Sequence, residues 1–211
     1  MEFFDDDNFF LSTGTFRFRD LTQNKKSIFG KIMLMNINNK ELKIISMGHR
    51  NIQGMFYDKK KDVLFSVDHG PQGGDEINLN INPKSEKIKN FGWAISSYGE
   101  HYGGKKAPRN KKKYLKYPLH KSHSDYGYIE PIKYFNPSIG ISQILGLDKI
   151  NKYVVASLKD NSIYFFDLQN YNVENLERVN MGERIRDMIK VENGLILFLE
   201  DTASIAFITL K

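Results

Sequence analysis

The chain has 211 residues, of which 40% are hydrophobic and 13% aromatic, and its formal net charge is +6 at pH 7. This composition is typical of a folded domain with a sizeable core and argues against intrinsic disorder. The absence of cysteine excludes disulfides and thiol chemistry. No apolar stretch is long enough to span a bilayer, and residues 1–7 lack the basic start and apolar run of a secretory signal.

The elements predicted along the chain are short β-strands separated by turns. They are expected at 8–16, 30–37, 53–58, 63–67, 77–81, 143–148, 153–159, 162–168, 187–191, 195–199 and 204–210. The order strand, turn, strand, turn, strand recurs, and its last two copies lie about forty residues apart, the period of propeller blades. The sequence therefore predicts an all-β fold, with residues 1–211 forming a single partial β-propeller domain; a β-sandwich is the alternative.

A long insertion is expected at about 82–135, between the second and third sets of strands. Loops of this length usually carry function or cover a site. Residues 101–124 contain no Asp or Glu but eight basic side chains. These are Lys105, Lys106, Arg109, Lys111, Lys112, Lys113, Lys116 and Lys121. A basic run can meet phosphates or an anionic membrane surface. No nucleic-acid-binding module surrounds it, so a solvated loop is favoured and no nucleic-acid partner is expected.

The most informative stretch is the turn after the strand at 63–67. It reads Asp-His-Gly-Pro-Gln-Gly-Gly-Asp-Glu over residues 68–76. Glycine allows close approach to the backbone and proline fixes φ, so the carbonyl oxygens of Gly70 and Pro71 can be aimed at a hard cation such as calcium. The simpler interpretation is a tight turn braced by Asp75 and Glu76, which could instead bind a second, structural cation.

This turn also carries a family resemblance. Residues 69–79, followed by Asn-Phe-Gly-Trp at 90–93 and Ser-Tyr-Gly at 97–99, resemble the signature of the glucose/sorbosone dehydrogenases. These are soluble aldose dehydrogenases that use pyrroloquinoline quinone (PQQ) with calcium. The resemblance implies a six-bladed propeller, of which this chain would supply about four blades from the C-terminal portion.

The resemblance also implies which residues bind the cofactors. Calcium would lie against Gly70 and Pro71, and the residues implied to contact PQQ beside that turn are Arg50, Asn51, Lys159, Arg184 and Arg186. Arginine suits the three carboxylates of PQQ because its planar donors pair with a carboxylate bidentately. Arg184 and Arg186 would share a face if extended, whereas the ordinary alternative is surface ion pairs with Glu183 and Asp187.

By resemblance, the reaction is oxidation of an aldose at its anomeric carbon by hydride transfer to the quinone. A separate electron acceptor then reoxidises the quinone. The family's catalytic histidine comes from an earlier blade, so no catalytic residue is assigned here. A second chain could complete the ring, and the family is periplasmic or secreted. The alternatives are a non-catalytic propeller that binds a ligand or partner, and a calcium-dependent propeller lactonase. A structural or exposed role is expected for the histidines, namely His49, His69, His101, His120 and His123.

Overall fold

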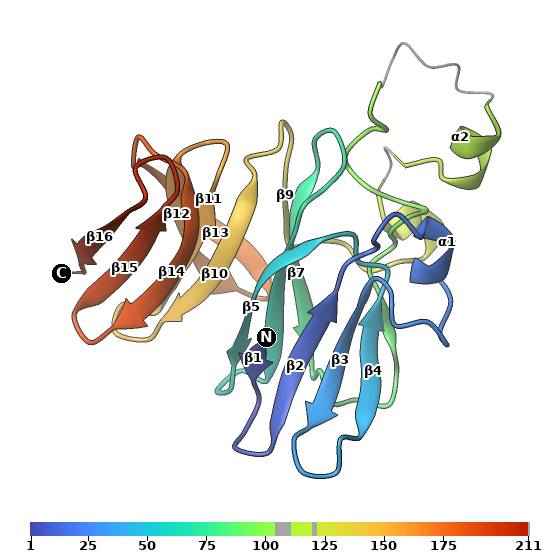
Figure 1. Ribbon diagram of the computed structural model, residues 1–211, viewed down its shortest axis with the longest axis horizontal. Helices are drawn as coiled ribbons and strands as arrows, with labels where there is room; N and C mark the ends of the chain where they lie inside the picture. Colours follow the sequence, from blue (N-terminus) through green and yellow to red (C-terminus); the bar gives the residue numbers. More distant parts are fainter. Residues whose placement is uncertain (104–110, 120–121, 211) are drawn as a thin grey trace.

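The computed structural model describes residues 1–103, 111–119 and 122–210. Several residues singled out in the sequence lie outside these ranges, namely His120 and the basic residues Lys105, Lys106, Arg109 and Lys121. The described residues form four β-sheets with few helical turns, and the sheets stand side by side (Figure 1). The prediction of an all-β chain with about four blades is confirmed.

The first two sheets come mainly from the first third of the chain. The first has the order β1 (Glu2–Phe3), β2 (Asn8–Thr13), β3 (Lys31–Asn36), β4 (Leu42–Met47) and β8 (Lys89–Asn90). The second consists of β5 (Ile52–Asp58), β6 (Val63–Asp68), β7 (Asp75–Ile81) and β9 (Lys133–Phe135). Neighbouring strands are antiparallel except β4 and β8, which are parallel.

The last two sheets are local in sequence. The third consists of β10 (Ile141–Leu147), β11 (Lys152–Ser157), β12 (Ser162–Gln169) and β13 (Asn172–Asn180). The fourth consists of β14 (Ile185–Val191), β15 (Gly194–Leu199) and β16 (Ser204–Thr209). The helical elements are α1 (Arg19–Thr22), α2 (Lys112–Lys116) and a 3₁₀ turn at Ser124–Tyr126. Within the described ranges, no helix has the length and apolarity needed to cross a membrane.

Each pair of successive sheets encloses its own apolar cluster. The alternation of side chains along β6 shows how: Val63, Phe65 and Val67 pack toward the third sheet, while Leu64 packs toward the first. The side chains of β11 alternate in the same way, with Tyr153 packed toward the second sheet and Val154 toward the fourth. Because side chains alternate across a strand, inner sheets must be apolar on both faces. The face-to-face packing is that of propeller blades.

The antiparallel order brings many connections to one end of the sheets. We call this end, uppermost in Figure 1, the site face. It carries the connections β4–β5, β6–β7, β9–β10, β11–β12, β13–β14 and β15–β16. Hydrogen bonds between sheets hold it together, such as Thr15 N–H to the carbonyl of Arg50 at 2.9 Å and Ser142 Oγ to the carbonyl of Ile185 at 2.7 Å.

The long segment between β7 and β9 also reaches the site face. Trp93 N–H donates to the carbonyl of Gly48 at 2.9 Å, which places this segment over the β4–β5 connection. Within the segment expected as an insertion at about 82–135, residues 133–135 form β9 and pair with β7. Residues 89–90 likewise form β8 at the edge of the first sheet.

Candidate functional site

The glycine turn is braced by one buried carboxylate. Asp75 accepts hydrogen bonds from the backbone N–H groups of Gly70 at 3.0 Å, Gly140 at 2.7 Å and Ile141 at 3.2 Å. The turn is folded so tightly that a Cβ atom on Gly70 would lie 2.1 Å from the carbonyl oxygen of Gly74. The sequence requires glycine here because any side chain would collide with the backbone.

Two carbonyl oxygens of this turn are free to act as ligands. Within the described ranges, no N–H or O–H group donates to the carbonyl of Gly70 or Pro71. The same residues contain no cluster of three His, Cys, Asp or Glu side chains able to hold a metal. A cation at this turn would therefore depend on backbone oxygens, which hard cations accept. Both oxygens of Asp75 are occupied by N–H groups, which fits bracing rather than a second cation.

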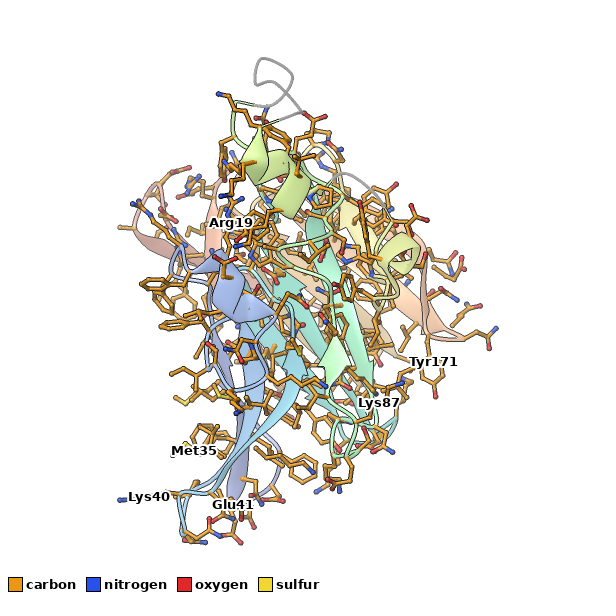
Figure 2. All side chains as sticks on the ribbon, turned by 90° about the vertical axis from the view of Figure 1, so that its right-hand side faces the viewer. Arg19, Met35, Lys40, Glu41, Lys87 and Tyr171 are labelled. Atoms are coloured by element: carbon orange, nitrogen blue, oxygen red, sulfur yellow. The ribbon has the colours of Figure 1, made fainter. Side chains whose placement is uncertain are left out.

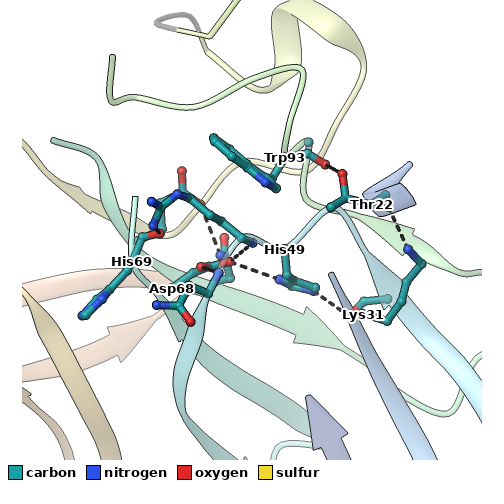
Figure 3. A network of polar contacts seen from close by, with 12 residues as sticks. Thr22, Lys31, His49, Asp68, His69 and Trp93 are labelled. Carbon is teal, nitrogen blue, oxygen red and sulfur yellow. Dashed lines mark hydrogen bonds and ion pairs between the residues drawn. The ribbon is translucent and has the colours of Figure 1, made fainter. Parts of the chain in front are cut away.

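Arg50 lies directly beside the turn. Asp68 accepts the backbone N–H groups of Arg50 at 2.8 Å and Asn51 at 2.5 Å, and so fixes the β4–β5 connection (Figure 3). Nη1 of Arg50 donates to the carbonyl of His69 at 2.8 Å, one residue before Gly70. Among the described residues, no carboxylate forms an ion pair with this guanidinium. Arg50 is thus a cation held in place, and no carboxylate in the described part of the chain is ion-paired with it.

The other predicted cations lie at the third and fourth sheets. Nη1 of Arg184 is 3.5 Å from the carbonyl of Leu158, next to the exposed Lys159. Arg184 and Arg186 both reach the carboxylate of Glu200, and Arg184 Nε is 3.8 Å from Asp201. The two arginines share a face, as expected. The suggested ion-pair partners Glu183 and Asp187 were wrong, because the β15–β16 connection supplies the acids.

A continuous series of hydrogen bonds links these sites across the sheets. Asp75 joins the turn at Gly70 to Gly140, and the carbonyl of Gly140 accepts the N–H of Leu158 at 2.7 Å. Leu158 in turn contacts Arg184. The structure therefore brings all seven predicted residues to the site face, although each cation comes from a different connection or strand end.

Arg19 and Trp93 are site-face residues for which the sequence analysis suggested no role. The guanidinium carbon of Arg19 is 5.2 Å from the ring centre of Trp93, and that of Arg50 is 5.5 Å from it. Arg19 Nη1 is also 3.1 Å from Nδ1 of His101. Burial lowers the pKa of Arg19, and the charge of Arg50 lowers it further. The sequence feature that could have pointed to Arg19 was the polar segment 17–29, which folds onto the site face.

Three histidines are buried and hydrogen-bonded, as expected of structural residues. His49 lies 2.8 Å from Ser46 Oγ, and Figure 3 shows it pointing toward Asp68. His101 Nε2 is 2.7 Å from the carbonyl of Tyr117. His123 lies between Ser96 and Glu76, at 3.0 Å from each. Burial alone would lower the pKa of His123, but the hydrogen bond and charge of Glu76 outweigh burial and raise it.

A small polar pocket lies beneath these residues. Two buried nitrogens on its wall, Trp93 Nε1 and His69 Nε2, have no hydrogen-bond partner among the described residues. Buried polar atoms normally find a partner, and the pocket, at about 10 Å³, has room for one water or a single ligand oxygen. Its lining consists of Arg50, Asp68, His69, Gly70, Glu76, Trp93, Ser96, Ser97 and His123.

Four sheets packed face to face, with cations and an open glycine turn gathered at one end, define a β-propeller whose loop face is the candidate ligand site. Residues 1–209 match the family model described as Glucose / Sorbosone dehydrogenase. The chain therefore belongs to the glucose/sorbosone dehydrogenase family, a family of sugar-oxidising oxidoreductases, as its signature suggested.

Known relatives are longer than this chain. It is 30% identical to aldose sugar dehydrogenase YliI of Escherichia coli (strain K12) over 169 residues, which cover 76% of this chain but 42% of that protein. A glucose dehydrogenase crystal structure shares the fold at a TM-score of 0.77 and 22% identity, covering 97% of this chain and 61% of that one. The PQQ-bound aldose sugar dehydrogenase of Streptomyces coelicolor has a TM-score of 0.61 and 21% identity, covering 92% of this chain and 53% of that one.

Proposed function

We propose that these four sheets are part of a PQQ- and calcium-dependent aldose dehydrogenase that oxidises the anomeric carbon of a sugar by hydride transfer to the quinone. The observation that carries the proposal is the position of Arg50 beside the carbonyl oxygens of Gly70 and Pro71. Among the residues that the structure describes, no carboxylate is ion-paired with Arg50 and no donor reaches these two oxygens. Family membership and the PQQ-bound relative support it.

The residues present fit these cofactors. PQQ carries three carboxylates, and Arg50 has no carboxylate partner in the described ranges. Arg184 and Arg186 have only half-exposed ion pairs, which are weak and can be exchanged for a ligand. Bound PQQ supplies a two-electron acceptor, and calcium at Gly70 and Pro71 supplies Lewis acidity.

The chain's own residues would bind and orient. Asp68 fixes the backbone of Arg50 and Asn51, so that the β4–β5 connection is ordered before a ligand arrives. Asp75 fixes the two carbonyl oxygens at the turn. Lys159 and Arg184 would close the opposite side, since they lie together at the ends of the third and fourth sheets.

Oxidation to a lactone removes two electrons and two protons from the sugar, so a base must accept the hydroxyl proton. We assign that base to no residue of this chain. His49, His101 and His123 are buried and hydrogen-bonded. His69 lies within the matched signature, at a position that the resemblance does not give as the base. We further propose an aldose substrate, a separate electron acceptor, sheets supplied from outside these four to complete the ring, and a periplasmic or secreted location.

The test is a titration of the 211-residue chain with PQQ, with and without calcium, followed by glucose-dependent reduction of a dye. We expect calcium-dependent quinone binding. A folded protein that binds no PQQ would overturn the proposal. PQQ could also bind without dye reduction, even after addition of the further sheets that the longer relatives contain. That result would indicate a non-catalytic binding propeller. Calcium-dependent ester hydrolysis without quinone would indicate a lactonase.

A further inference from the structure

We propose that Arg19 and Trp93, beside Arg50, form a subsite for the acidic group of a sugar, so that the preferred substrate is an anionic aldose such as a uronic acid or a sugar phosphate. This inference rests on the proposed function and narrows its substrate class. It starts from Trp93, which both guanidiniums flank at 5.2 and 5.5 Å.

The first observation is an uncompensated pair of cations. In the described part of the chain, neither Arg19 nor Arg50 is ion-paired with a carboxylate, and residues 104–110 and 120–121 contain no acid. The neighbouring Asp20 is occupied by Lys116 and Tyr117. Two like charges in a partly buried place repel each other, and an anion bound by Arg19 relieves this repulsion while Arg50 stays available to the quinone.

The second observation is independent of charge. The indole N–H of Trp93 is buried, with the residue only 5% exposed, and finds no acceptor among the described residues. An indole N–H is a donor only, so a ligand oxygen in the pocket would satisfy it. Tyr102, which is 65% exposed and contacts Arg50, offers a ring face for a sugar at the rim.

The position of Arg19 separates this subsite from the proposed quinone carboxylates. Arg19 lies in α1, in the connection between β2 and β3 of the first sheet, and packs against the segment that carries α2 (Figure 2). The guanidinium carbon of Arg19 is 5.8 Å from the ring centre of Tyr117. Lys159, Arg184 and Arg186 come from the third and fourth sheets. Those three and Arg50 already offer four cations to three carboxylates, so Arg19 is left for a different anion.

The experiment uses the fluorescence of Trp93, the only tryptophan of the chain. Glucose, glucuronate and glucose 6-phosphate are titrated into the 211-residue chain, with and without PQQ and calcium. We expect at least one acidic sugar to bind about tenfold or more tightly than glucose, as a charge-assisted contact allows. Arg19→Gln should remove that preference, whereas Arg17→Gln, an exposed neighbour, should keep it.

Equal affinity for glucose and both acidic sugars would overturn the inference, and so would a preference that survives Arg19→Gln in a protein with native circular dichroism. If Arg19→Gln does not fold, the wild-type comparison of sugars still decides, and Arg19→Lys tests the charge. PQQ absorbance is followed in the same samples. Acid preference without quinone binding supports the subsite and refutes the proposed function, while quinone binding without acid preference refutes the subsite alone.

Discussion

At the scale of single residues, Asp75 does the most to shape the site. Its carboxylate accepts three backbone N–H groups, from the glycine turn and from the start of the third sheet. Asp75→Asn would turn an amide NH₂ toward at least one of these donors. We expect a loss of about 1–3 kcal/mol in the free energy of unfolding, measured by urea denaturation. The exposed Asp6→Asn serves as the control, and equal stability of both variants would contradict this role.

Arg184 tests the proposed cofactor site. Arg184→Ala should weaken PQQ binding by about 1.5–3 kcal/mol, roughly tenfold to a hundredfold, since a charge-assisted hydrogen bond is lost. Calorimetric titration with PQQ in the presence of calcium measures the change. The control is Lys190→Ala, which removes a cation from the far end of β14, the strand that begins directly after Arg184. An unchanged dissociation constant for Arg184→Ala removes this residue from the site.

His123 predicts a pH dependence of stability. Its pKa is raised above 6.5 by Glu76 in spite of burial, so the charged histidine stabilises the fold. That contribution is fully present below pH 6.5 and is lost as pH rises through the raised folded-state value. Glu76 and Glu130 are the acids that face it. We expect the unfolding free energy of the wild type to fall more steeply with rising pH than that of His123→Gln, and parallel curves would contradict this.

The residues of the glycine turn and Arg50 could be predicted because they lie in one short, ordered signature. The role of Arg19 could not be predicted, because it comes from contact with Trp93, which lies 74 residues later in the chain. The predicted ion-pair partners of Arg184 were wrong for the same reason. Sequence neighbours were preferred, whereas the fold presents Glu200 and Asp201 from the next connection.

At the scale of elements, one buried lysine holds the loop that carries Arg19. Lys31, at the start of β3, donates from Nζ to the carbonyls of Leu21 at 3.1 Å, Thr22 at 2.8 Å and Phe29 at 2.7 Å. Burial lowers the pKa of Lys31 to about 8. The carbonyl of Leu21 also accepts the N–H of Asn24 at 3.1 Å, so Lys31 matters most for the carbonyls of Thr22 and Phe29, to which no backbone N–H of the described residues donates.

Lys31→Met should therefore loosen residues 14–30 and destabilise the chain by about 1–3 kcal/mol for each carbonyl left without a donor or water. Faster amide hydrogen exchange across this loop is the measurement. Lys25→Met, an exposed lysine in the same loop, should leave exchange unchanged. Identical exchange in both variants would show that Lys31 does not order the loop.

Most strands could be predicted from their apolar alternation, but β1, β4, β8, β9 and β13 were not expected. The inner strand β4 carries readable alternation and was overlooked, whereas the other four lie at sheet edges. Strand β13 was not expected, because it is an outer strand whose side chains are mostly exposed and polar. Strands β8 and β9 are only two and three residues long and lie within a long connection. Edge strands gain their structure from pairing with a neighbour, which leaves little trace in their own sequence.

At the scale of the whole molecule, the fourth sheet leaves one apolar face uncovered. Its inner face packs on the third sheet, while Ile189, Phe198, Ile205 and Phe207 are exposed. Exposed apolar rows of this kind usually mark a contact surface. The repeat of about forty residues made the sheets predictable, but a repeat length alone does not count the sheets that a closed ring needs.

We expect the 211-residue chain to self-associate through this face at high concentration. Phe207→Glu should shift the sedimentation profile toward a monomer, because it places a charge on the exposed apolar row. Thr209→Glu adds the same charge to an exposed polar position of β16 and controls for net charge. A monomer at all concentrations, or equal effects of the two variants, would contradict this expectation.

The separate apolar cluster between each pair of sheets makes the molecule a linear array coupled only between nearest neighbours. In such an array, an inner unit is stabilised by two interfaces and a terminal unit by one. Opening should therefore begin at the ends and move inward, so that amides of β6 and β11 are the last to exchange. The glycine turn, carried by the second sheet, would keep its shape while the outer sheets fray.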